Sequence, residues 1–419
     1  MTATILTFIA TIDPTRRAAL DAALADLARQ VNTPPGNPFA GVPTLHFASF
    51  VVFDEEPYEP ILVFENNFNG PLDAHLRALI AALGGVLRTI FGCCTGYDAA
   101  SASADAGLAG YLRSRVVKPA AYHVGNVGRS RDRILAEASL QEELAARVDA
   151  RMLRAGAPVS RDAAYDLVRR EMIDAGRFEW VPDPHERQTF AERVMPWVKL
   201  IGAGLLLAVG ALVLLPLTIL AVVILRLKEL SDRPMNPADL DPSHVQRLTD
   251  AEDHRIQNHL ASITPIKDGL FRRATITLVL WVVNLGARTA THGSLSGITS
   301  IHFAHWALLD GGRRLLFLSN FDGSWENYLD DFIDKAAPGL SMIWTNAVGF
   351  PRTKFLRGGG AKDGVAFKAY ARNMQFKTAV WYSAYPHLTV QQIDAHSTLR
   401  EGLASKPAGP ALDAWLRSV

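Results

Sequence analysis

The chain alternates between short apolar stretches and longer segments in which apolar residues recur at helical spacing. In the first third of the chain, short apolar stretches bounded by turn residues predict strands at 5–12, 46–53, 60–64 and 120–124. Helices are predicted at 15–31, from 72 to about 83, at 108–115 and at 129–153. This order of strands and helices, with one extra helix, is typical of a ferredoxin-like unit.

Three short strings recur in the same order later in the chain. His46-Phe47-Ala48 returns as His302-Phe303-Ala304, with an offset of 256, and Asn67-Phe68-Asn69-Gly70 returns as Asn320-Phe321-Asp322-Gly323, with an offset of 253. The apolar and acidic spacing that begins at Ile134 returns at Ile393, with an offset of 259. Nearly constant offsets over a hundred residues indicate a duplication with short insertions in the loops.

The duplication defines a domain organisation. In the second copy, strands are predicted at 259–266, 301–309, 314–319 and 378–384, and helices at 269–287, 324–336 and 389–404. We therefore predict an α+β fold of two tandem ferredoxin-like repeats with an inserted hydrophobic membrane segment. The predicted parts are repeat 1 (1–155), a helical connector (156–199), the membrane segment (200–225), a charged linker (226–254), repeat 2 (255–405) and a C-terminal tail (406–419).

Residues 200–225 contain no charged residue and are mostly apolar, so a helix of this length could cross about 30 Å of hydrocarbon. A buried core helix is the alternative, although core helices of this length normally carry some polar residues. A single crossing would place the two repeats on opposite sides of the membrane. Pro216 lies within the run and could kink it into a hairpin that returns the chain to the same side. We expect both repeats on the cytoplasmic side of a membrane.

A second apolar segment, 274–287, is apolar all round, whereas the matching helix of the first repeat is amphipathic. At this length it is short for a membrane span. We expect it to lie buried between the two repeats, with contact to lipid as the alternative.

Charge and cysteine content restrict the classes of function. Forty-three basic and 42 acidic residues give a net charge of +1, so no global field favours nucleic acid, and we expect no nucleic-acid partner. The only two cysteines, Cys93 and Cys94, are adjacent and are predicted to be reduced thiols in a cytoplasmic setting, with a vicinal redox pair as the alternative. The first residues lack the pattern of a secretory signal.

The sequence contains no nucleophile elbow, Walker loop, HExxH or paired CxxC motif. Asp322 follows a predicted strand and precedes a helix, where it could cap the helix or act as an acid/base group with Arg352 as its cationic partner. His302 and His305 are three apart on one strand and are expected on opposite faces, so they could not chelate one metal there. His396, on the last helix of repeat 2, is either a surface residue or a haem ligand.

An Asn-Phe-Asp-Gly string between a strand and a helix, within two ferredoxin-like repeats, resembles the dimeric α/β-barrel superfamily and, distantly, the dye-decolorising peroxidases. The resemblance implies haem b in the C-terminal repeat. Asp322 matches the aspartate of the peroxidase Gly-x-x-Asp-Gly motif, and Ser319 stands where that motif has its first glycine. Arg352 corresponds to the distal arginine, His396 to the proximal metal ligand, and His302 is a further cofactor-binding candidate.

Two hypotheses follow. The first is a membrane-attached, haem-dependent, peroxidase-like oxidoreductase that acts on a peroxide or another small molecule. The second is a non-catalytic, membrane-bound binding or scaffold module with a lipid or partner in its cleft. Either hypothesis is compatible with an oligomer.

Overall fold

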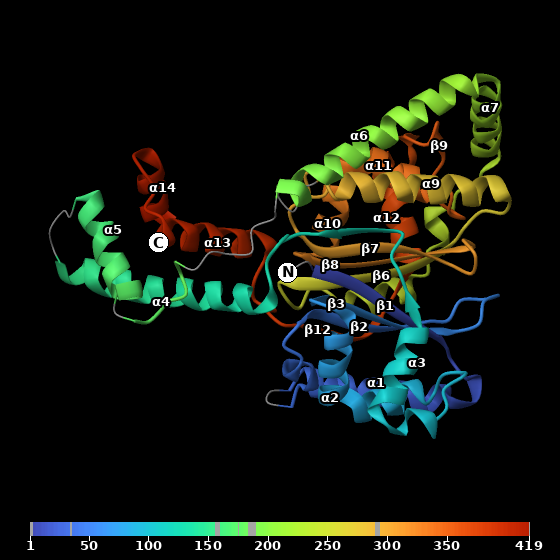
Figure 1. Cartoon of the computed structure of the whole chain (residues 1–419). Coiled ribbons are helices and arrows are strands. Elements are labelled where there is room, and N and C mark those ends of the chain that lie inside the picture. Colours follow the sequence, from blue (N-terminus) through green and yellow to red (C-terminus); the bar gives the residue numbers. More distant parts are fainter. Residues whose placement is uncertain are drawn as a thin grey trace.

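The computed structural model describes residues 3–33, 36–155, 160–174, 176–182, 190–289 and 294–418. Within these ranges the chain is a mixed α/β protein with two five-stranded antiparallel sheets. Figure 1 shows the two sheets as neighbouring layers with helices on their outer sides. The strand orders are β12-β2-β3-β1-β4 in the first sheet and β11-β6-β8-β7-β5 in the second.

The first half of the chain begins with the strands and helices that the apolar pattern predicts. They are β1 (Ala3–Thr11), α1 (Arg17–Val31), β2 (Leu45–Phe53), β3 (Ile61–Asn69), α2 (Leu72–Phe91), α3 (Asp105–Ser114), β4 (Val116–Val117) and β5 (Ala121–Val124). Strand β3 runs five residues beyond its predicted end, through the string Glu65–Asn69, which is mostly polar.

The second half repeats this order with additional short elements. They are β6 (Gln257–Pro265), α9 (Leu270–Ala287), β7 (Ile301–Leu309), β8 (Arg314–Asp322), α10 (Trp325–Asp331), α11 (Ala337–Trp344), β9 (Thr353–Lys354), β10 (Gly358–Gly359), α12 (Gly364–Asn373), β11 (Gln375–Phe376) and β12 (Thr378–Ser383). The predicted helix at 324–336 is α10 followed by a single π turn.

The closing strands are exchanged between the two sheets. Strand β4 pairs with β1 of its own half, but β5, a few residues later, pairs with β7 of the other half. In the same way β11 pairs with β6, and β12 crosses to pair with β2. The sequence predicted each closing strand within its own repeat. The exchange depends on the chain crossing from one sheet to the other, which no local pattern encodes.

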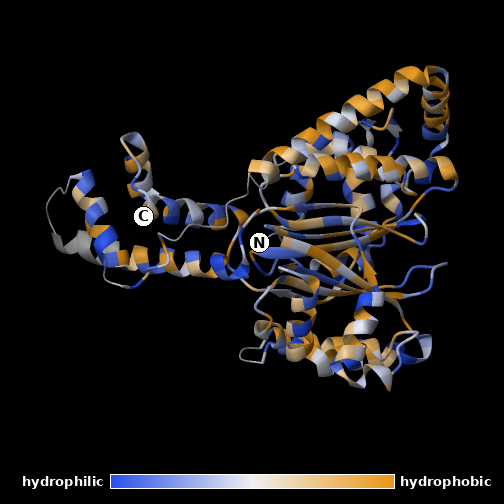
Figure 2. Ribbon diagram, in the orientation of Figure 1, coloured by the Kyte–Doolittle hydropathy of each residue, from blue (hydrophilic) through white to orange (hydrophobic). Residues whose placement is uncertain are grey.

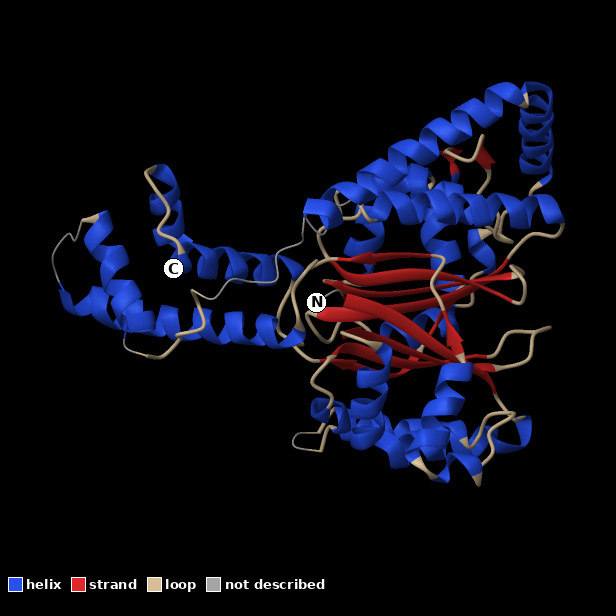
Figure 3. Ribbon diagram, in the orientation of Figure 1, coloured by secondary structure: helices blue, strands red, loops and turns tan. Residues whose placement is uncertain are grey.

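The two sheets pack against each other through an apolar layer. Val51, Val63, Ile263, Leu316 and Leu318 are among the buried residues of this layer. Helices α1 to α3 cover the outer face of the first sheet, and α9 to α12 cover the outer face of the second. Figure 3 shows the resulting order of helix layer, two strand layers and helix layer.

Four helices form an arm beside the sheets (Figure 1). They are α4 (Arg131–Ala155), α5 (Arg161–Arg169), α13 (Val390–Ala404) and α14 (Pro410–Ser418). Tyr165 and Trp415 lie in the small apolar core of the arm, together with leucines of α4 and α13. Helix α5 of the predicted connector therefore packs against α14 of the tail, whereas the end of the connector belongs to α6, which packs against α9.

The long apolar run forms two helices instead of one. Helix α6 (Phe190–Val213) ends at Leu214, and α7 (Leu215–Ser231) begins with Pro216 in its first turn. Proline lacks an N–H and fits the start of a helix, so the break falls at the predicted kink. Figure 2 shows both helices coloured apolar along most of their length, on the outer side of the second sheet. A short helix, α8 (Pro242–Thr249), follows.

Among the described residues, three helices are long and apolar enough to cross a membrane by length and composition: Leu72–Phe91, Val194–Val213 and Leu270–Ala287. Half of the first is buried in the protein, whereas none of the second is. The third corresponds to α9, which was expected between the two repeats. That expectation is wrong, because α9 lies on the outer face of the second sheet beside α6, with Leu278 and Trp281 exposed.

The exchange of strands generates a first prediction. A Cβ atom added at Gly125, directly after β5, would lie 2.2 Å from the backbone oxygen of Ile301 in β7. We expect Gly125→Ala to lower the free energy of unfolding by about 1–3 kcal/mol, because neither backbone can move without disturbing the ladder. Thermal unfolding followed by circular dichroism measures the effect.

The matched control is Gly286→Ala in α9, where an added Cβ meets no atom within 4 Å. Alanine is favoured over glycine in a helix, so this variant should be as stable as the wild type or slightly more stable. Equal melting temperatures of Gly125→Ala and the wild type would contradict the close approach of the backbone at Gly125 to β7.

Candidate functional site

A carboxylate is buried between the two sheets. Glu65 on β3 is fully buried, and its carboxylate lies 3.1 Å from His259 Nε2 and 3.4 Å from His305 Nδ1, both on the second sheet. The hydroxyl of Ser49 donates a hydrogen bond to the same carboxylate at 3.1 Å. The two histidines and Glu65 come from different halves of the chain, so only the packed sheets bring them together.

The charge on Glu65 is set by two opposing effects. Burial raises the pKa of this carboxyl group, but hydrogen bonds and electrostatic attraction from His259 and His305 lower it by more. The pKa of Glu65 therefore lies well below its ordinary value, and the group is ionised at neutral pH. His305 also contacts the hydroxyl of Thr7 through Nε2 at 2.9 Å, which adds another link between the sheets.

His302 and His305 lie on the same face of β7, whereas the sequence predicted opposite faces. The register shifts between Ile301 and Phe303, which is a β-bulge. A bulge adds one residue to one strand and changes the alternation of side chains. His302 therefore contacts Phe47 of the first sheet, and His305 contacts Glu65 of the same sheet. Strand β2 has the matching shift between Leu45 and Phe47.

Asp322 and His302, two of the predicted site residues, are brought together. His302 Nε2 lies 2.7 Å from one carboxylate oxygen of Asp322, and the other oxygen accepts a hydrogen bond from the backbone N–H of Val390 at 2.7 Å. Asp322 thus ties β8 to the start of α13. It does not cap α10, because Ser324 fills that position.

The corresponding pair in the first half is His46 and Asn69. His46 Nε2 contacts the side-chain oxygen of Asn69, and Nδ1 contacts the hydroxyl of Tyr385 at 2.8 Å. Burial lowers the pKa of His46 to about 4, so the ring is neutral at pH 7. His46 is therefore hydrogen-bonded at both ring nitrogens, whereas His302 contacts Asp322 and Gln257 through Nε2 and its buried Nδ1 has no hydrogen-bond partner among the described residues.

Arg352 lies far from Asp322, so their predicted pairing is wrong. Asp322 pairs with the first residue of β6, whereas the loop that carries Arg352 hydrogen-bonds to the last residue of that strand, Pro265. A nine-residue strand separates these ends by roughly 27 Å. The guanidinium group of Arg352 instead donates to the backbone oxygen of Asp232 at 3.0 Å.

His396 lies on α13, which packs against α4 in the arm and not against a sheet. Its ring is partly buried, and burial lowers its pKa. His302 is buried, and its Nε2 already contacts Asp322. Among the described residues, no group of three or more histidine, cysteine and acidic side chains is arranged to hold a metal ion.

A crevice of about 290 Å³ opens beside His259 at the edge of the two sheets. His259 Nδ1 lies 2.8 Å from the hydroxyl of Thr378, and both residues line this crevice. A chain of contacts therefore runs from buried Glu65 through His259 to Thr378 at the crevice wall. Arg255, Lys377 and Glu252 also line the crevice; because Glu252 is paired with Arg372, the two basic residues leave the crevice with an excess of positive charge.

Sequence reasoning missed Glu65, His259 and Thr378. One signal was present, because Glu65 stands between apolar Phe64 and two asparagines, Asn66 and Asn67, the second of which begins a repeated string. A continuous strand through this string would have forced Glu65 into a buried sheet, where a charge requires partners.

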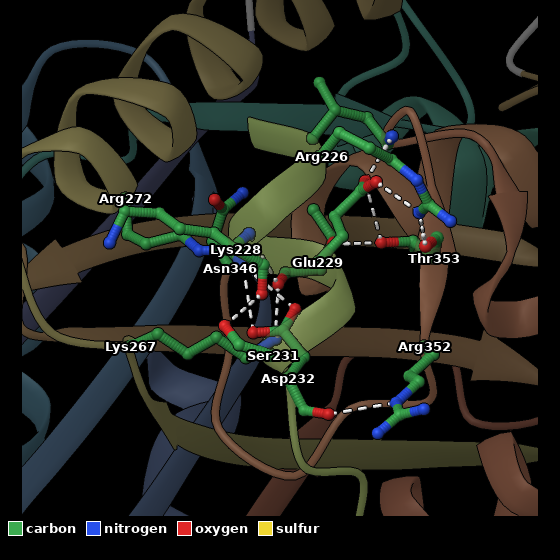
Figure 4. A network of polar contacts seen from close by, with 12 residues as sticks. Arg226, Lys228, Glu229, Ser231, Asp232, Lys267, Arg272, Asn346, Arg352 and Thr353 are labelled. Atoms are coloured by element: carbon green, nitrogen blue, oxygen red, sulfur yellow. Dashed lines mark hydrogen bonds and ion pairs between the residues drawn. The ribbon is translucent and has the colours of Figure 1, made fainter. Parts of the chain in front are cut away.

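A second polar cluster lies at the base of the apolar hairpin α6–α7, and Figure 4 shows it from close by. The carboxylate of Asp232 accepts two hydrogen bonds of 2.9 Å from Arg272 on α9 and lies 2.7 Å from Lys267 Nζ. Glu229, one turn earlier on α7, points the other way toward Thr353 (Figure 4). These two acidic residues attach the end of α7 to the second half of the chain.

The fold and these two polar sites define a mixed α/β protein with paired antiparallel sheets and an exposed apolar hairpin. Comparison of the chain with known family models, curated proteins and solved structures finds no match.

The neutral state of His46 generates a second prediction. An unfolded histidine has a pKa of about 6.5, whereas burial lowers the folded value to about 4. Above pH 6.5 the ring is neutral in both states. As the pH falls from 6.5 to 4, the unfolded chain binds a proton that the folded chain does not, so this group destabilises the fold by about 3 kcal/mol in total.

Replacement of His46 by glutamine keeps a polar group but removes the titration. In this pH range, the loss of stability per pH unit should be about 1.4 kcal/mol smaller in His46→Gln than in the wild type. Urea unfolding at several pH values measures both slopes. Equal slopes would show that His46 is not held neutral.

Proposed function

We propose that this protein is a membrane-attached binding module whose apolar hairpin α6–α7 enters one leaflet of a membrane. The observation that carries the proposal is the exposure of the hairpin: Leu206, Leu212 and Val213 are each at least 70% exposed, and no part of the 194–213 window is buried. A soluble protein rarely exposes so large a continuous apolar surface.

The exchanged strands favour a hairpin over a single crossing. Because β5 and β12 tie the two sheets into one body, the chain before α6 and the chain after α7 lie on the same side. The uncharged part of α6, from residue 200, rises only about 21 Å, and that of α7, to residue 225, about 16 Å. Each is shorter than the hydrocarbon core of about 30 Å.

We also propose that each half is a ferredoxin-like unit. The order of strands and helices in β1 to β4 and in β6 to β11, together with the near-constant offset of the repeated strings, supports this assignment. The cytoplasmic placement of the body remains part of the proposal, since basic residues flank the hairpin at both ends.

Haem binding remains a prediction of the family resemblance, and the site residues fit it poorly. His302 is engaged with Asp322, His396 faces α4, and Arg352 lies at the other end of β6. We therefore prefer the binding module to the peroxidase-like enzyme, and we derive no reaction through haem.

The contacts from Glu65 to Thr378 favour a second candidate function, hydrolysis of a small anionic ester in the crevice. The hydroxyl of Thr378 would attack the ester carbonyl while His259 Nδ1 takes its proton, and Glu65 would stabilise the charged ring. His259 would then return the proton to the departing alcohol. Water would hydrolyse the acyl group from Thr378 by the same route. Arg255 and Lys377 would attract the anionic ester.

The hairpin is tested by single cysteines at Lys199, Leu214 and Leu230, in a background where Cys93 and Cys94 are replaced by alanine. All three introduced positions are exposed in the structure. The protein is bound to the outside of sealed vesicles and treated with a thiol reagent that cannot cross lipid. We expect labelling at Lys199 and Leu230 and protection at Leu214, because a hairpin has both ends on one side.

Labelling of Lys199 without Leu230, followed by labelling of Leu230 after the vesicles are opened, would show a single crossing. Equal labelling of all three cysteines would show that the hairpin does not enter the membrane.

The second candidate is tested with a 4-nitrophenyl ester that carries a carboxylate. We expect Thr378→Val, which removes the hydroxyl at nearly constant shape, to lower the rate of nitrophenol release at least about 100-fold, and Thr378→Ser to retain most of it. Equal rates of nitrophenol release in Thr378→Val and the wild type would show that the Thr378 hydroxyl is not the nucleophile of an esterase.

A further inference from the structure

We propose that the β9–β10 hairpin, Thr353–Gly359, binds the phosphate of anionic lipid headgroups beside the end of α7. The inference rests on the proposed membrane attachment and adds a lipid preference to it. Three observations support the inference: Glu229 fixes the backbone of the β9–β10 hairpin, the exposed side chains of this hairpin are basic and aromatic, and the hairpin lies beside the end of α7.

The tip of the β9–β10 hairpin has an unusual backbone. Phe355 and Leu356 have φ angles of 50° and 63°, in the left-handed region that residues other than glycine rarely adopt. Such a conformation persists only where the surroundings determine it. We therefore expect contacts from the surrounding residues to hold the tip in a single backbone conformation.

Glu229 holds this shape from α7. Its carboxylate accepts hydrogen bonds from the backbone N–H of Phe355 at 2.8 Å and of Leu356 at 2.7 Å, and from the hydroxyl of Thr353 at 3.1 Å. The Glu229 side chain is 0% exposed. Figure 4 shows Glu229 pointing from α7 toward Thr353 and Arg226. The β9–β10 hairpin is thus fixed to α7, the helix in which the apolar run ends.

The exposed side chains of the tip are basic and aromatic. Lys354 and Arg357 are exposed, Phe355 is 49% exposed, and Arg226 of α7 lies over the Phe355 ring at 5.6 Å. The string from 350 to 360 contains no acidic residue. Glu229 and Asp232, the nearby acids on and after α7, are already engaged by hydrogen bonds and ion pairs. The tip therefore has an excess of positive charge that complements an anionic lipid.

Space for a headgroup lies next to the tip. An open crevice of about 550 Å³ is lined by Met235, Arg352, Gly359, Gly360 and Val365, among others, and also by Asp363, whose carboxylate accepts a hydrogen bond from the backbone N–H of Ala366 at 3.1 Å. Glycine at 359 and 360, both with positive φ, leaves the crevice wall without side chains. Arg352, whose side chain lacks a carboxylate partner among the ion pairs of the described residues, stands at this crevice.

In the proposed attachment, the tip of the β9–β10 hairpin lies at the level where α7 leaves the hydrocarbon and enters the headgroup region. Arg226 is the first charged residue after the uncharged run, so the end of α7 would leave the hydrocarbon there. Arg226 also donates to the backbone oxygen of Thr353 at 3.2 Å, which places β9 at the same level. Basic residues and exposed aromatic rings are enriched at this depth, where lipid phosphates lie.

The test is binding of the full chain to vesicles of phosphatidylcholine alone and of phosphatidylcholine mixed with phosphatidylglycerol. Each basic residue near an anionic surface strengthens binding by about fivefold. Loss of two such residues in Lys354→Ala with Arg357→Ala should weaken binding to the anionic vesicles about 30-fold. Binding to the neutral vesicles should not change, and the difference should shrink at high salt.

The matched control is Arg77→Ala with Lys118→Ala, which removes the same charge from exposed positions of the first half. It should bind both kinds of vesicle like the wild type. An equal loss in the control and in the tip variant would show a general charge effect and overturn the headgroup site. Equal binding of the tip variant and the wild type to anionic vesicles would also overturn it.

The two proposals fail in different ways. A wild-type chain that binds neutral vesicles without preferring anionic ones overturns the headgroup site but leaves the apolar hairpin as a membrane anchor. A wild-type chain that binds neither kind of vesicle overturns membrane attachment itself.

Discussion

The exchange of β5 and β12 between the two sheets is the interaction on which the rest of the structure depends. Each exchanged strand satisfies the backbone groups along one edge of the other sheet, where an open edge would otherwise invite pairing with another chain. The two halves cannot separate without breaking both ladders. The inserted hairpin α6–α7 therefore starts and ends on one rigid body, which restricts any membrane contact to entry and return on the same side.

Glu65 lies at the middle of β3, between two buried apolar clusters of the inter-sheet layer, and its polar contacts fix how the sheets are placed. An apolar layer tolerates small sliding movements, whereas hydrogen bonds do not. Thr7 contacts His305, and Glu65 contacts both His259 and His305, each across the gap between the sheets. Removing one partner would leave a buried charge unpaired, which generally costs about 3–5 kcal/mol. The cluster thus holds a single arrangement, and it keeps His259 directed at the crevice.

The sequence predicted most strands and the break at Pro216, because apolar patterning and proline chemistry are local signals. It ended β3 and β8 too early, because Asn67 and Asn320 are polar, although both are buried in the structure. The bulges at His46 and His302 depend on strand pairing, so the alternation of faces was predicted incorrectly for β7. The exchange of strands and the distance between Asp322 and Arg352 are long-range features. Residue types alone cannot specify them.

Ion pairs of Asp232, at the end of α7, connect the α6–α7 hairpin to the second half of the chain. Asp232 is 8% exposed and is engaged by Arg272 and Lys267, which anchor it to α9 and to the end of β6. The hairpin should therefore move with the second sheet as one unit. Helices α6, α7 and α9 lie on the outer side of that sheet (Figure 1), whereas the crevice beside His259 is lined by residues of β6, β11 and β12. In the proposed attachment, the hairpin meets lipid while the crevice between the sheets stays in water, so the two surfaces can act independently.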